Sequence, residues 1–364
     1  MARQKEVKTQ LTGFAAYSRD SLTYTHKQRF GMATWKKVLI CVLATLLVAA
    51  VGAGVAAGLY LNQINKNLKG SYTEEEQFAI QEKLVPVENV DEPFYIMLIG
   101  SDERANDDSM GARSDSNILV RVDPINWVVT MISIPRDTQI TYKGSTMKFN
   151  AVYSYGGAAG VIDATSQLCG VEISHYAEVN FDGLEALVDS IGGVEVDVPQ
   201  PIDDPQAGSA TIDEAGLQTL NGAQALVFAR SRHYYVDGDF SRSASQRALI
   251  MAIVNKVLSL PVGEIPGKVQ DMSKCVSTDY NINQLYSLAM QYTNSGKEIT
   301  LYSAMAPSTT GEEAGASYVY VNKTDLANMM ELVEAGEDPN TVELTSGALI
   351  SGNYEHYSYT EGLD

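Results

Sequence analysis

The stretch AEVNFDGLEALVDSIGGVEVDV, residues 177–198, contains the pattern that decides the fold. It predicts a short strand, then a helix whose apolar residues recur at helical spacing, then a second strand. The glycine pair at residues 192–193 ends this helix, because glycine is the usual residue just beyond a helix C-terminus. A strand, a helix and a strand in this order indicate an α/β domain. The apolar residues of the helix are Leu184, Leu187, Val188 and Ile191.

The rest of residues 92–335 continues this alternation of strands and helices. Three apolar runs upstream predict strands at residues 94–100, 117–122 and 127–134, each ending near acidic residues or arginines. No change in composition divides the region, so we expect a single α-β-α domain with a central mixed β-sheet. Further helices are predicted at 158–168, 217–229, 243–260, 279–295 and 322–335, with a strand at 297–305.

Residues 38–61 form an uncharged apolar run that is long enough to cross a membrane as one helix. The preceding residues 1–37 contain eight basic and two acidic residues, and this bias keeps the N-terminus in the cytoplasm and exports the rest. A cleaved signal peptide is the alternative, but the run is longer than a signal-peptide core, which favours a retained anchor. We therefore expect a single-pass protein of the cell membrane with an extracellular domain.

The segments around the domain are polar or lack periodicity. Residues 62–91 contain a run of glutamates and are expected to form an extracellular stalk. Residues 336–364 have no helical or strand period and are expected to be a flexible tail. The sequence therefore predicts five parts: a cytoplasmic tail, an anchor, a stalk, residues 92–335 as the catalytic domain, and a C-terminal tail.

The charge of the exported part excludes several functions. The whole chain has 26 basic and 45 acidic residues, so the part beyond residue 37 carries a net charge of −25. Such a surface repels nucleic acid, and we expect no nucleic-acid partner. The histidines are scattered and no CxxC motif occurs, which argues against a zinc enzyme. Cys169 and Cys275 form either a disulfide or two buried thiols, and their spacing does not decide between these.

Arginine is confined to two segments of this acidic part of the chain. After residue 61 there are eight arginines, four at residues 104–136 and four in ARSRHYYVDGDFSRSASQR, residues 229–247. Arginine binds phosphate oxygens with a planar, permanently charged fork, so the two segments predict one shared anion site, most simply for phosphate. The alternative is that these arginines only pair with the abundant acidic residues. The helix predicted from Ser243 would add the free backbone N–H groups of its first turn, which holds Gln246 and Arg247.

Six motifs in order carry a resemblance to a known family. They are LIGSDER, GARSDS, SIPRDT, KFNAVYSYGG, VNFDGLEALVDSIGGVEVDV and ALVFARSRHYYVDGDFSR. Across residues 92–335 the chain resembles the LytR–CpsA–Psr family of membrane-anchored enzymes, which attach glycopolymers to the cell wall of Gram-positive bacteria. The resemblance implies transfer of a glycopolymer from a polyprenyl-pyrophosphate carrier to a sugar hydroxyl of peptidoglycan, the C6 hydroxyl of N-acetylmuramic acid, with polyprenyl phosphate as the leaving group.

The resemblance also implies roles for individual residues. Asp102 and Asp115 match ligands of Mg²⁺, for which Mn²⁺ is a substitute, and with Arg113 and Arg136 they form the expected catalytic set. Asp102 or Asp115 is also the candidate base. The residues expected to bind pyrophosphate are Arg113, Arg136, Arg230, Arg232, Arg242 and Gln246. The residues expected to orient them are Asp137, Asn150 and Asp239.

One position departs from the family pattern. An arginine is common three residues after Arg242, but this chain has Ser245, and whether Arg247 replaces the missing arginine is open. The lipid is expected along apolar helices in a groove that opens toward the membrane. Two other functions remain open: a pyrophosphatase that uses water as the acceptor, and a non-catalytic regulator that binds wall polymers. The candidate lipid contacts are Val188, Ile191, Leu249, Ile250 and Ile253.

Overall fold

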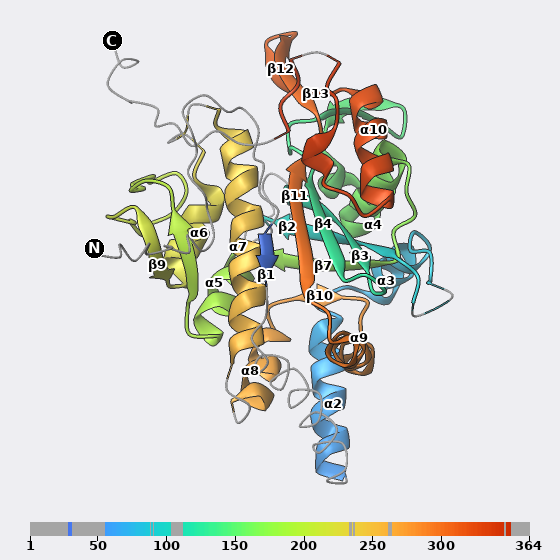
Figure 1. Ribbon diagram of the computed structural model, residues 1–364, viewed down its shortest axis with the longest axis vertical. Helices are drawn as coiled ribbons and strands as arrows, with labels where there is room; N and C mark the ends of the chain where they lie inside the picture. Colours follow the sequence, from blue (N-terminus) through green and yellow to red (C-terminus); the bar gives the residue numbers. More distant parts are fainter. Residues whose placement is uncertain are drawn as a thin grey trace, which may run out of the picture.

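A seven-stranded mixed sheet forms the centre of the molecule (Figure 1). The computed structural model describes residues 28–30 and 55–350, apart from 88, 90, 103–111, 233, 234, 236, 261–263 and 346. In spatial order the strands are β1 (Gln28–Phe30), β11 (Ile299–Met305), β4 (Val128–Ser133), β3 (Ser114–Asp123), β2 (Phe94–Ser101), β7 (His175–Asn180) and β10 (Ser277–Thr278). Strands β11 and β4 are parallel, as are β2 and β7, and the other neighbours are antiparallel. The predicted α/β domain with a central mixed sheet is confirmed.

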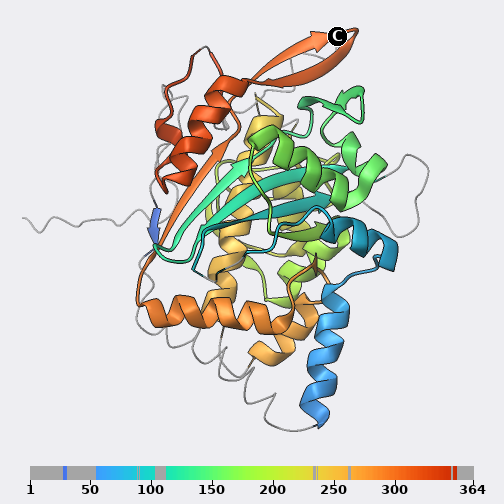
Figure 2. The same ribbon diagram turned by 90° about the vertical axis from the view of Figure 1, so that its right-hand side faces the viewer.

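Strand β2 buries apolar side chains on both faces of the sheet, because successive side chains of a strand point to opposite sides. Phe94 packs in a cluster with Ile118 and Met131, whereas Tyr95 and Met97 belong to the cluster on the other face. Helices α3 (Glu74–Gln81), α4 (Ala151–Cys169) and α10 (Lys323–Glu334) cover the Met97 face. Helices α7 (Asp239–Ser259) and α9 (Ile282–Ser295) cover the Phe94 face, which gives three layers (Figure 2).

A second lobe packs beside α7 and has its own apolar core. It contains α5 (Phe181–Ser190), α6 (Gly222–Arg230), α8 (Ile265–Met272) and a two-stranded sheet of β8 (Val194–Val198) and β9 (Gly216–Leu220). The strand predicted after α5 therefore forms β8, which lies outside the central sheet. The helix predicted at residues 217–229 was wrong at its start, because residues 216–220 pair with β8 and the helix begins only after the capping residue Asn221.

Two hairpins near one end of the sheet were not predicted. One joins β5 (Gln139–Tyr142) to β6 (Ser145–Lys148), and the other joins β12 (Ser308–Glu313) to β13 (Ala316–Val321). The strands are short, and their turns require residues with positive φ, such as Lys143 and Gly144 in the first hairpin and Ala314 and Gly315 in the second.

The expected stalk, residues 62–91, packs against the domain instead of standing free. Helix α2 (Val55–Leu68) buries Ile64 and Leu68 against Ile282 of α9, and the Ile282 N–H donates to Asn65 Oδ1. Helix α3 buries Ile80 in the main core. The apolar residues inside these polar segments are thus sufficient to attach them to the domain.

The expected C-terminal tail is also ordered over its first part. Val342 and Ile350 are buried in the main core, and the Met305 N–H donates to the carbonyl of Ile350. The 3-10 helix η1 (Pro339–Thr341) lies between them and α10. Residues 336–350 therefore pack on the domain, and residues 351–364 lie outside the described residues.

The predicted anchor falls mostly outside the described part of the chain. Residues 38–54 lie there, and the last seven residues of the apolar run form the start of α2. Among the described residues, none of the helices has the length and apolar character needed to cross a membrane. Strand β1 pairs with β11, which differs from the predicted cytoplasmic placement of residues 1–37: a segment paired with β11 lies on the same side of a membrane as the domain.

The two cysteines beyond the apolar run are free thiols. Cys169 is buried at the end of α4, and Cys275 is half-buried after α8. Of the two alternatives left by the sequence, a disulfide is therefore excluded. Only Cys169 fits the second alternative, a buried thiol.

Candidate active site

A cavity of about 340 Å³ lies between the central sheet and the second lobe. Strands β2, β3 and β7 form one wall, and helices α5, α6 and α7 form the other. Charged side chains gather where α6 ends and α7 begins, whereas apolar residues line the length of α7 that follows. The cavity is therefore amphipathic. Of the predicted site residues, those that line it are Asp115, Arg136, Arg230, Arg232, Arg242 and Gln246.

Arg136 and Asp115 face each other because of the antiparallel register of β3 and β4. Ile118 pairs with Ser133, and continuing this register by three residues in each strand places Asp115 opposite Arg136. The Arg136 Nη1 donates to Asp115 Oδ1 at 2.8 Å. Their side chains are 15% and 16% exposed, so the ion pair is partly withdrawn from water yet open to the cavity.

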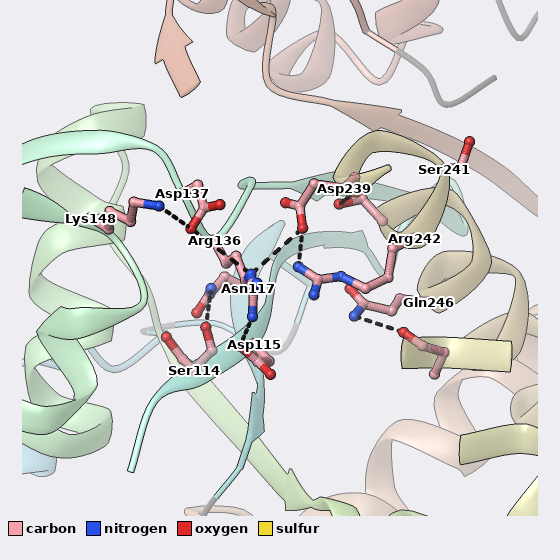
Figure 3. Close-up of polar contacts among 12 residues, drawn as sticks. Ser114, Asp115, Asn117, Arg136, Asp137, Lys148, Asp239, Ser241, Arg242 and Gln246 are labelled. Atoms are coloured by element: carbon pink, nitrogen blue, oxygen red, sulfur yellow. Dashed lines mark hydrogen bonds and ion pairs between the residues drawn. The ribbon is translucent and has the colours of Figure 1, made fainter. Parts of the chain in front are cut away.

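Helix α7 adds a second ion pair to the same cluster (Figure 3). Asp239, in its first turn, contacts the guanidinium of Arg242, one turn further along. The Arg136 Nε lies 3.6 Å from Asp239 Oδ1, so Asp239 lies between two arginines from distant parts of the chain. Burial raises the pKa of Asp239, and the two arginines offset this only in part. Burial lowers the pKa of Arg136, but Asp115 and Asp239 outweigh it, and the net direction is upward.

Two buried donors of this cluster make no hydrogen bond with the described residues. The Arg242 Nε is one, and the other is the Arg136 Nε, which has only ion-pair contacts of 3.6 Å with Asp239 and 3.9 Å with Asp137. Because an unpaired buried donor costs about 1–3 kcal/mol, such atoms indicate that a ligand acceptor belongs there. The cluster therefore suits an anion that enters from the cavity.

The start of α7 differs from the prediction in a way that matters for the site. The helix begins at Asp239, four residues before the predicted start, so Gln246 and Arg247 do not lie in its first turn. The Asp237 side chain accepts from the Ser241 N–H, and the Asp237 carbonyl accepts from the Phe240 N–H. The helix N-terminus is capped in this way, and the anion site consists of side chains.

Gln246 and Arg230 link α7, α6 and the loop that precedes β9. Gln246 donates from Nε2 to the carbonyl of Ala229 at 3.2 Å. Arg230 donates from Nη1 to the carbonyl of Ala207 at 2.8 Å, and its guanidinium lies 4.2 Å from the centre of the Phe181 ring. These contacts fix the direction of Arg230 along the cavity wall.

Asp204 is a site residue that the sequence analysis missed. Its buried carboxylate accepts from the Gln206 N–H and from the Ser231 hydroxyl, which orders the loop that supplies the Ala207 carbonyl. Asp204 follows Asp203 directly in a Pro-, Asp- and Gly-rich loop, and no sequence signal distinguishes the two aspartates. Only the folded chain brings it beneath Arg230.

Asp102 and Arg113 lie together, but not among the residues that line the cavity. The Asp102 N–H donates to the Arg113 carbonyl at 2.9 Å, and the Arg113 N–H donates to the Asp102 carboxylate. The pair closes the loop between β2 and β3, where β2 already bulges at Gly100. Arg113 is exposed, so its predicted contact with pyrophosphate stays a prediction.

The described residues could hold a magnesium ion only if a bound substrate supplied further oxygen ligands. Among the described residues no group of three or more His, Cys, Asp or Glu side chains is arranged to hold a metal. Asp102 and Asp115 each use one carboxylate oxygen in a hydrogen bond and keep the other. Mg²⁺ is commonly held by one or two carboxylates plus phosphate oxygens and water, so Asp115, which lines the cavity, is a chemically suitable ligand, and Asp102 is the second carboxylate that the resemblance implies.

The three predicted orienting residues act in different ways. Asp239 contacts the site arginines directly, whereas Asp137 lies 3.2 Å from Lys148 Nζ and 3.9 Å from Arg136 Nε. Asn150 is buried and acts through its backbone: its N–H donates to the Arg136 carbonyl and its carbonyl accepts from the Ser114 N–H. The backbone of Asn150 thereby connects the ends of β3 and β4.

Arg247 does not replace the arginine that is missing at Ser245. Its side chain is 3% exposed and donates to the hydroxyls of Ser303 and Ser133, inside the layer between α7 and the sheet. Arg247 is one residue beyond Gln246, so about 100° of helix rotation separates the two side chains. Gln246 lines the cavity, and Arg247 faces the sheet.

The apolar residues predicted to contact the lipid fall into two groups. Leu249, Ile250 and Ile253 line the cavity, whereas Val188 and Ile191 are 0% and 2% exposed within the core of the second lobe. The sequence analysis missed Leu184, Leu187 and Val254, which line it as well.

Five of the six motifs, all except KFNAVYSYGG, contribute residues that line this cavity. The sequence profile of the LytR_cpsA_psr family matches residues 56–334. The chain belongs to the LytR–CpsA–Psr family.

Several relatives and solved structures show how far the similarity extends. The chain is 30% identical over 315 residues to Biofilm regulatory protein A of Streptococcus mutans, covering 81% of this chain and 75% of that protein. It is 29% identical over 311 residues to the polyisoprenyl-teichoic acid–peptidoglycan teichoic acid transferase TagU of Enterococcus faecalis, covering 82% and 97%. The crystal structure of TagV from B. subtilis aligns with a TM-score of 0.58 at 29% identity, covering 68% of this chain and 97% of that one.

Proposed function

We propose that this protein is a transferase that moves a teichoic-acid-type glycopolymer from a polyisoprenyl-pyrophosphate carrier to peptidoglycan. The observation that carries the proposal is the amphipathic cavity, with four arginines at one end and an apolar wall at the other. A pyrophosphate joined to a long lipid has the same division of charge and apolar surface. The names of TagU from Enterococcus faecalis and of TagV from Bacillus subtilis describe this transfer for those relatives.

The substrate would lie along α7. Arg230, Arg232 and Arg242 would bind the pyrophosphate together with Arg136, and Gln246 would mark the start of the apolar part. The lipid would then follow Leu249, Ile250 and Ile253 toward the C-terminal end of the helix. That end points toward the same side of the molecule as the first residues of α2, where an anchor would enter the membrane (Figure 1).

The reaction needs charge neutralisation and alignment more than a protein nucleophile. An acceptor sugar hydroxyl, at the C6 position of N-acetylmuramic acid, attacks the phosphorus that carries the glycan. A new P–O bond forms, the bond to the bridging oxygen breaks, polyprenyl phosphate leaves, and the hydroxyl proton is released. Arg136 and Arg242 stabilise the charge on the phosphate oxygens, and their shared contact with Asp239 holds them in place before the substrate binds.

Asp102 and Asp115 would hold Mg²⁺, or Mn²⁺ in its place, which when bound neutralises charge on the pyrophosphate oxygens. Asp115 or Asp102 would take the acceptor proton; of the two, only Asp115 lines the cavity, and a metal-bound carboxylate is a weaker base. Arg113, beside Asp102, would complete the catalytic set after the substrate binds.

We also propose that residues 38–61 anchor the protein in the cell membrane with the domain outside. The charge bias of residues 1–37 supports this topology. Pairing of β1 with β11 and a cytoplasmic N-terminus exclude each other, so a Cys at position 29 tests the topology. In intact cells of a background without other thiols (Cys41→Ser, Cys169→Ala and Cys275→Ser), Arg29→Cys should resist a membrane-impermeant maleimide until the cells are lysed. Labelling before lysis would reject the anchored topology.

The transferase is tested with the purified protein, a defined polyprenyl-pyrophosphate glycan, peptidoglycan oligomers and Mg²⁺. The expected product is the glycan joined to the oligomer through a phosphodiester, identified by its mass, with loss of product in the Arg242→Gln variant. Free glycan phosphate as the sole product, with acceptor present, would identify a pyrophosphatase. No turnover, combined with full in-cell function of an Asp102→Ala, Asp115→Ala variant, would identify a binding regulator.

A further inference from the structure

The hairpin of β12 and β13 carries two tyrosines on one face. Tyr318 and Tyr320 are two residues apart on β13, so their side chains share a face, and Val319 between them points into the core. The ring centres are 6.3 Å apart and the ring planes are tilted by 45°. Both rings are partly exposed. The hairpin projects from the end of the molecule opposite α2 and α9 (Figures 1 and 2).

A glycine leaves room for one of these rings. A Cβ at Gly311 would lie 2.9 Å from Cε2 of Tyr320, so the ring lies directly over the backbone of β12. Gly311 pairs across the hairpin with Tyr318. The two tyrosines therefore form a shallow aromatic platform, here defined as Tyr318, Tyr320 and the Gly311 backbone.

The platform is attached to both halves of the candidate active site. The Val319 N–H donates to the Asp137 carbonyl at 2.9 Å, one residue after Arg136. The Val319 side chain packs with Phe240, one residue after Asp239 in α7. The core of the domain thereby fixes the distance between the aromatic platform and the arginine cluster.

A chain of polar contacts runs from the platform to that cluster. Lys148 Nζ lies 5.7 Å from the centre of the Tyr318 ring and 3.2 Å from Asp137 Oδ1. The same Asp137 oxygen lies 3.9 Å from Arg136 Nε (Figure 3). Tyr318 and Arg136 are thus connected through two intervening side chains, Lys148 and Asp137.

The charge of the hairpin indicates which substrate it suits. Glu312 and Glu313 at its tip are exposed, and Glu313 accepts from Gln139 Nε2 at 2.6 Å. These carboxylates repel a polyanionic donor such as a teichoic acid. They accept hydrogen bonds from hydroxyl and amide groups, and an aromatic face binds the C–H surface of a sugar ring.

We propose that the aromatic platform is the acceptor subsite, which binds the glycan strand of peptidoglycan and presents its hydroxyl to the arginine cluster. The inference rests on the proposed transferase function and names where its second substrate binds. The acceptor then approaches from the hairpin end of the molecule, and the lipid-linked donor approaches along α7 from the other end. The two substrates meet at Arg136 and Arg242 without competing for the same surface.

The test compares two changes to the platform in the transfer reaction. Tyr318→Ala combined with Tyr320→Ala removes both rings, and Gly311→Val keeps both rings but displaces Tyr320. Each should raise KM for a peptidoglycan oligosaccharide about tenfold, the effect of losing about 1.4 kcal/mol of binding. The kcat and the KM for the donor should stay within about twofold, because the arginine cluster is intact.

Two controls separate a binding role from a folding defect. Tyr320→Phe keeps the ring and should keep most of the acceptor affinity. Tyr286→Ala changes a partly exposed tyrosine of α9, at the other end of the molecule, and should leave the acceptor KM unchanged. Thermal unfolding shows whether each variant is folded. An unchanged acceptor KM in both platform variants, or a change in the donor KM alone, would overturn the proposal.

A protein without transferase activity can be distinguished from a protein without the acceptor subsite. If the unmodified protein transfers nothing, oligosaccharide binding is measured directly by calorimetry with the same variants. Binding that the unmodified protein shows and both platform variants lose still supports the subsite. Binding that is equal in all variants, or absent from the unmodified protein, rejects it.

Discussion

Arg136 and Asp115 form an ion pair of 2.8 Å across the ends of β4 and β3, and the pair faces the cavity. Arg136 also approaches Asp239 of α7, so one guanidinium connects the sheet to the helix that carries Arg242. A single side chain thereby joins the two arginine segments. Asp115 and Asp239 thereby hold the arginines in fixed positions, which is the form of preorganisation that electrostatic catalysis requires.

Arg136→Lys tests this connection. Lysine keeps the positive charge but has no planar fork to contact Asp115 and Asp239 together, so we expect kcat/KM to fall about 100-fold or more. Steady-state transfer kinetics measure the loss. Lys148→Arg, a charge-conserving change one contact away, should cost much less. Equal kinetics for Arg136→Lys and the unmodified protein would contradict the role of the fork.

Asp239→Asn tests the electrostatic cost of the buried carboxylate. The pKa of Asp239 is raised by burial, so the folded protein binds its proton more tightly than the unfolded chain does. Stability from this group is present below the ordinary value of 3.8 and is lost as the pH rises through the raised pKa. The melting temperature of Asp239→Asn, relative to the unmodified protein, should therefore increase as the pH rises from about 4. The opposite trend would show that the arginines outweigh burial.

Arg247→Leu distinguishes a structural arginine from the site arginines. The change leaves the buried hydroxyls of Ser133 and Ser303 without their donor, and we expect the free energy of unfolding to fall by about 2–4 kcal/mol. Urea denaturation measures this. The donor KM of the folded protein should not change, because Arg247 does not line the cavity. A loss of donor affinity without a loss of stability would place Arg247 in the site after all.

The two free cysteines predict the thiol reactivity of the protein. Burial raises the pKa of the Cys169 thiol to about 12, and burial with Asp271 nearby raises that of Cys275. In a Cys41→Ser background, Cys275 should react slowly with a thiol reagent in the native protein, and Cys169 only after unfolding. Ellman's reagent counts the reactive thiols in the native and in the unfolded protein. Unfolding in the presence of an alkylating reagent, without a reductant, should label two thiols; none would indicate a disulfide.

Ile253 and Ile191 are matched apolar residues with different roles. Ile253→Ala enlarges the cavity wall and should raise the donor KM about tenfold or more, since each buried CH₂ group contributes about 0.8 kcal/mol. Ile191→Ala opens a hole in the second lobe and should destabilise the protein by about 2–5 kcal/mol with little effect on KM. Denaturation and kinetics on both variants check this. A larger effect of Ile191→Ala than of Ile253→Ala on KM would reverse the assignment.

Much of the fold follows from local patterns. The strand at β2, the helices α5, α9 and α10, and the glycine stop at residues 192–193 are visible as periodicity and turn chemistry, because these depend on neighbouring residues. Part of the candidate site could also be predicted from the sequence, but for a different reason. The eight arginines beyond residue 61 fall in only two segments of an acidic chain, and this segregation predicted an anion site.

Other features required the tertiary structure. Residues 62–91 and 336–350 read as polar segments, but a few apolar residues such as Ile64, Ile80 and Ile350 bury against distant elements. Strand β12, Ser308–Glu313, is polar and largely exposed, so it shows no alternation of apolar residues that would predict a strand.

The sequence by itself determined which residues are charged, where most strands and helices of the domain lie, and that arginine is confined to two segments. Only the tertiary structure decided which of these arginines share a cavity. Gln246 and Arg247 are adjacent in sequence, yet one lines the cavity and the other binds Ser133 and Ser303. The reason is physical: a helix separates neighbouring side chains by about 100°, and the sheet and the second lobe determine which direction is the core and which is the cavity.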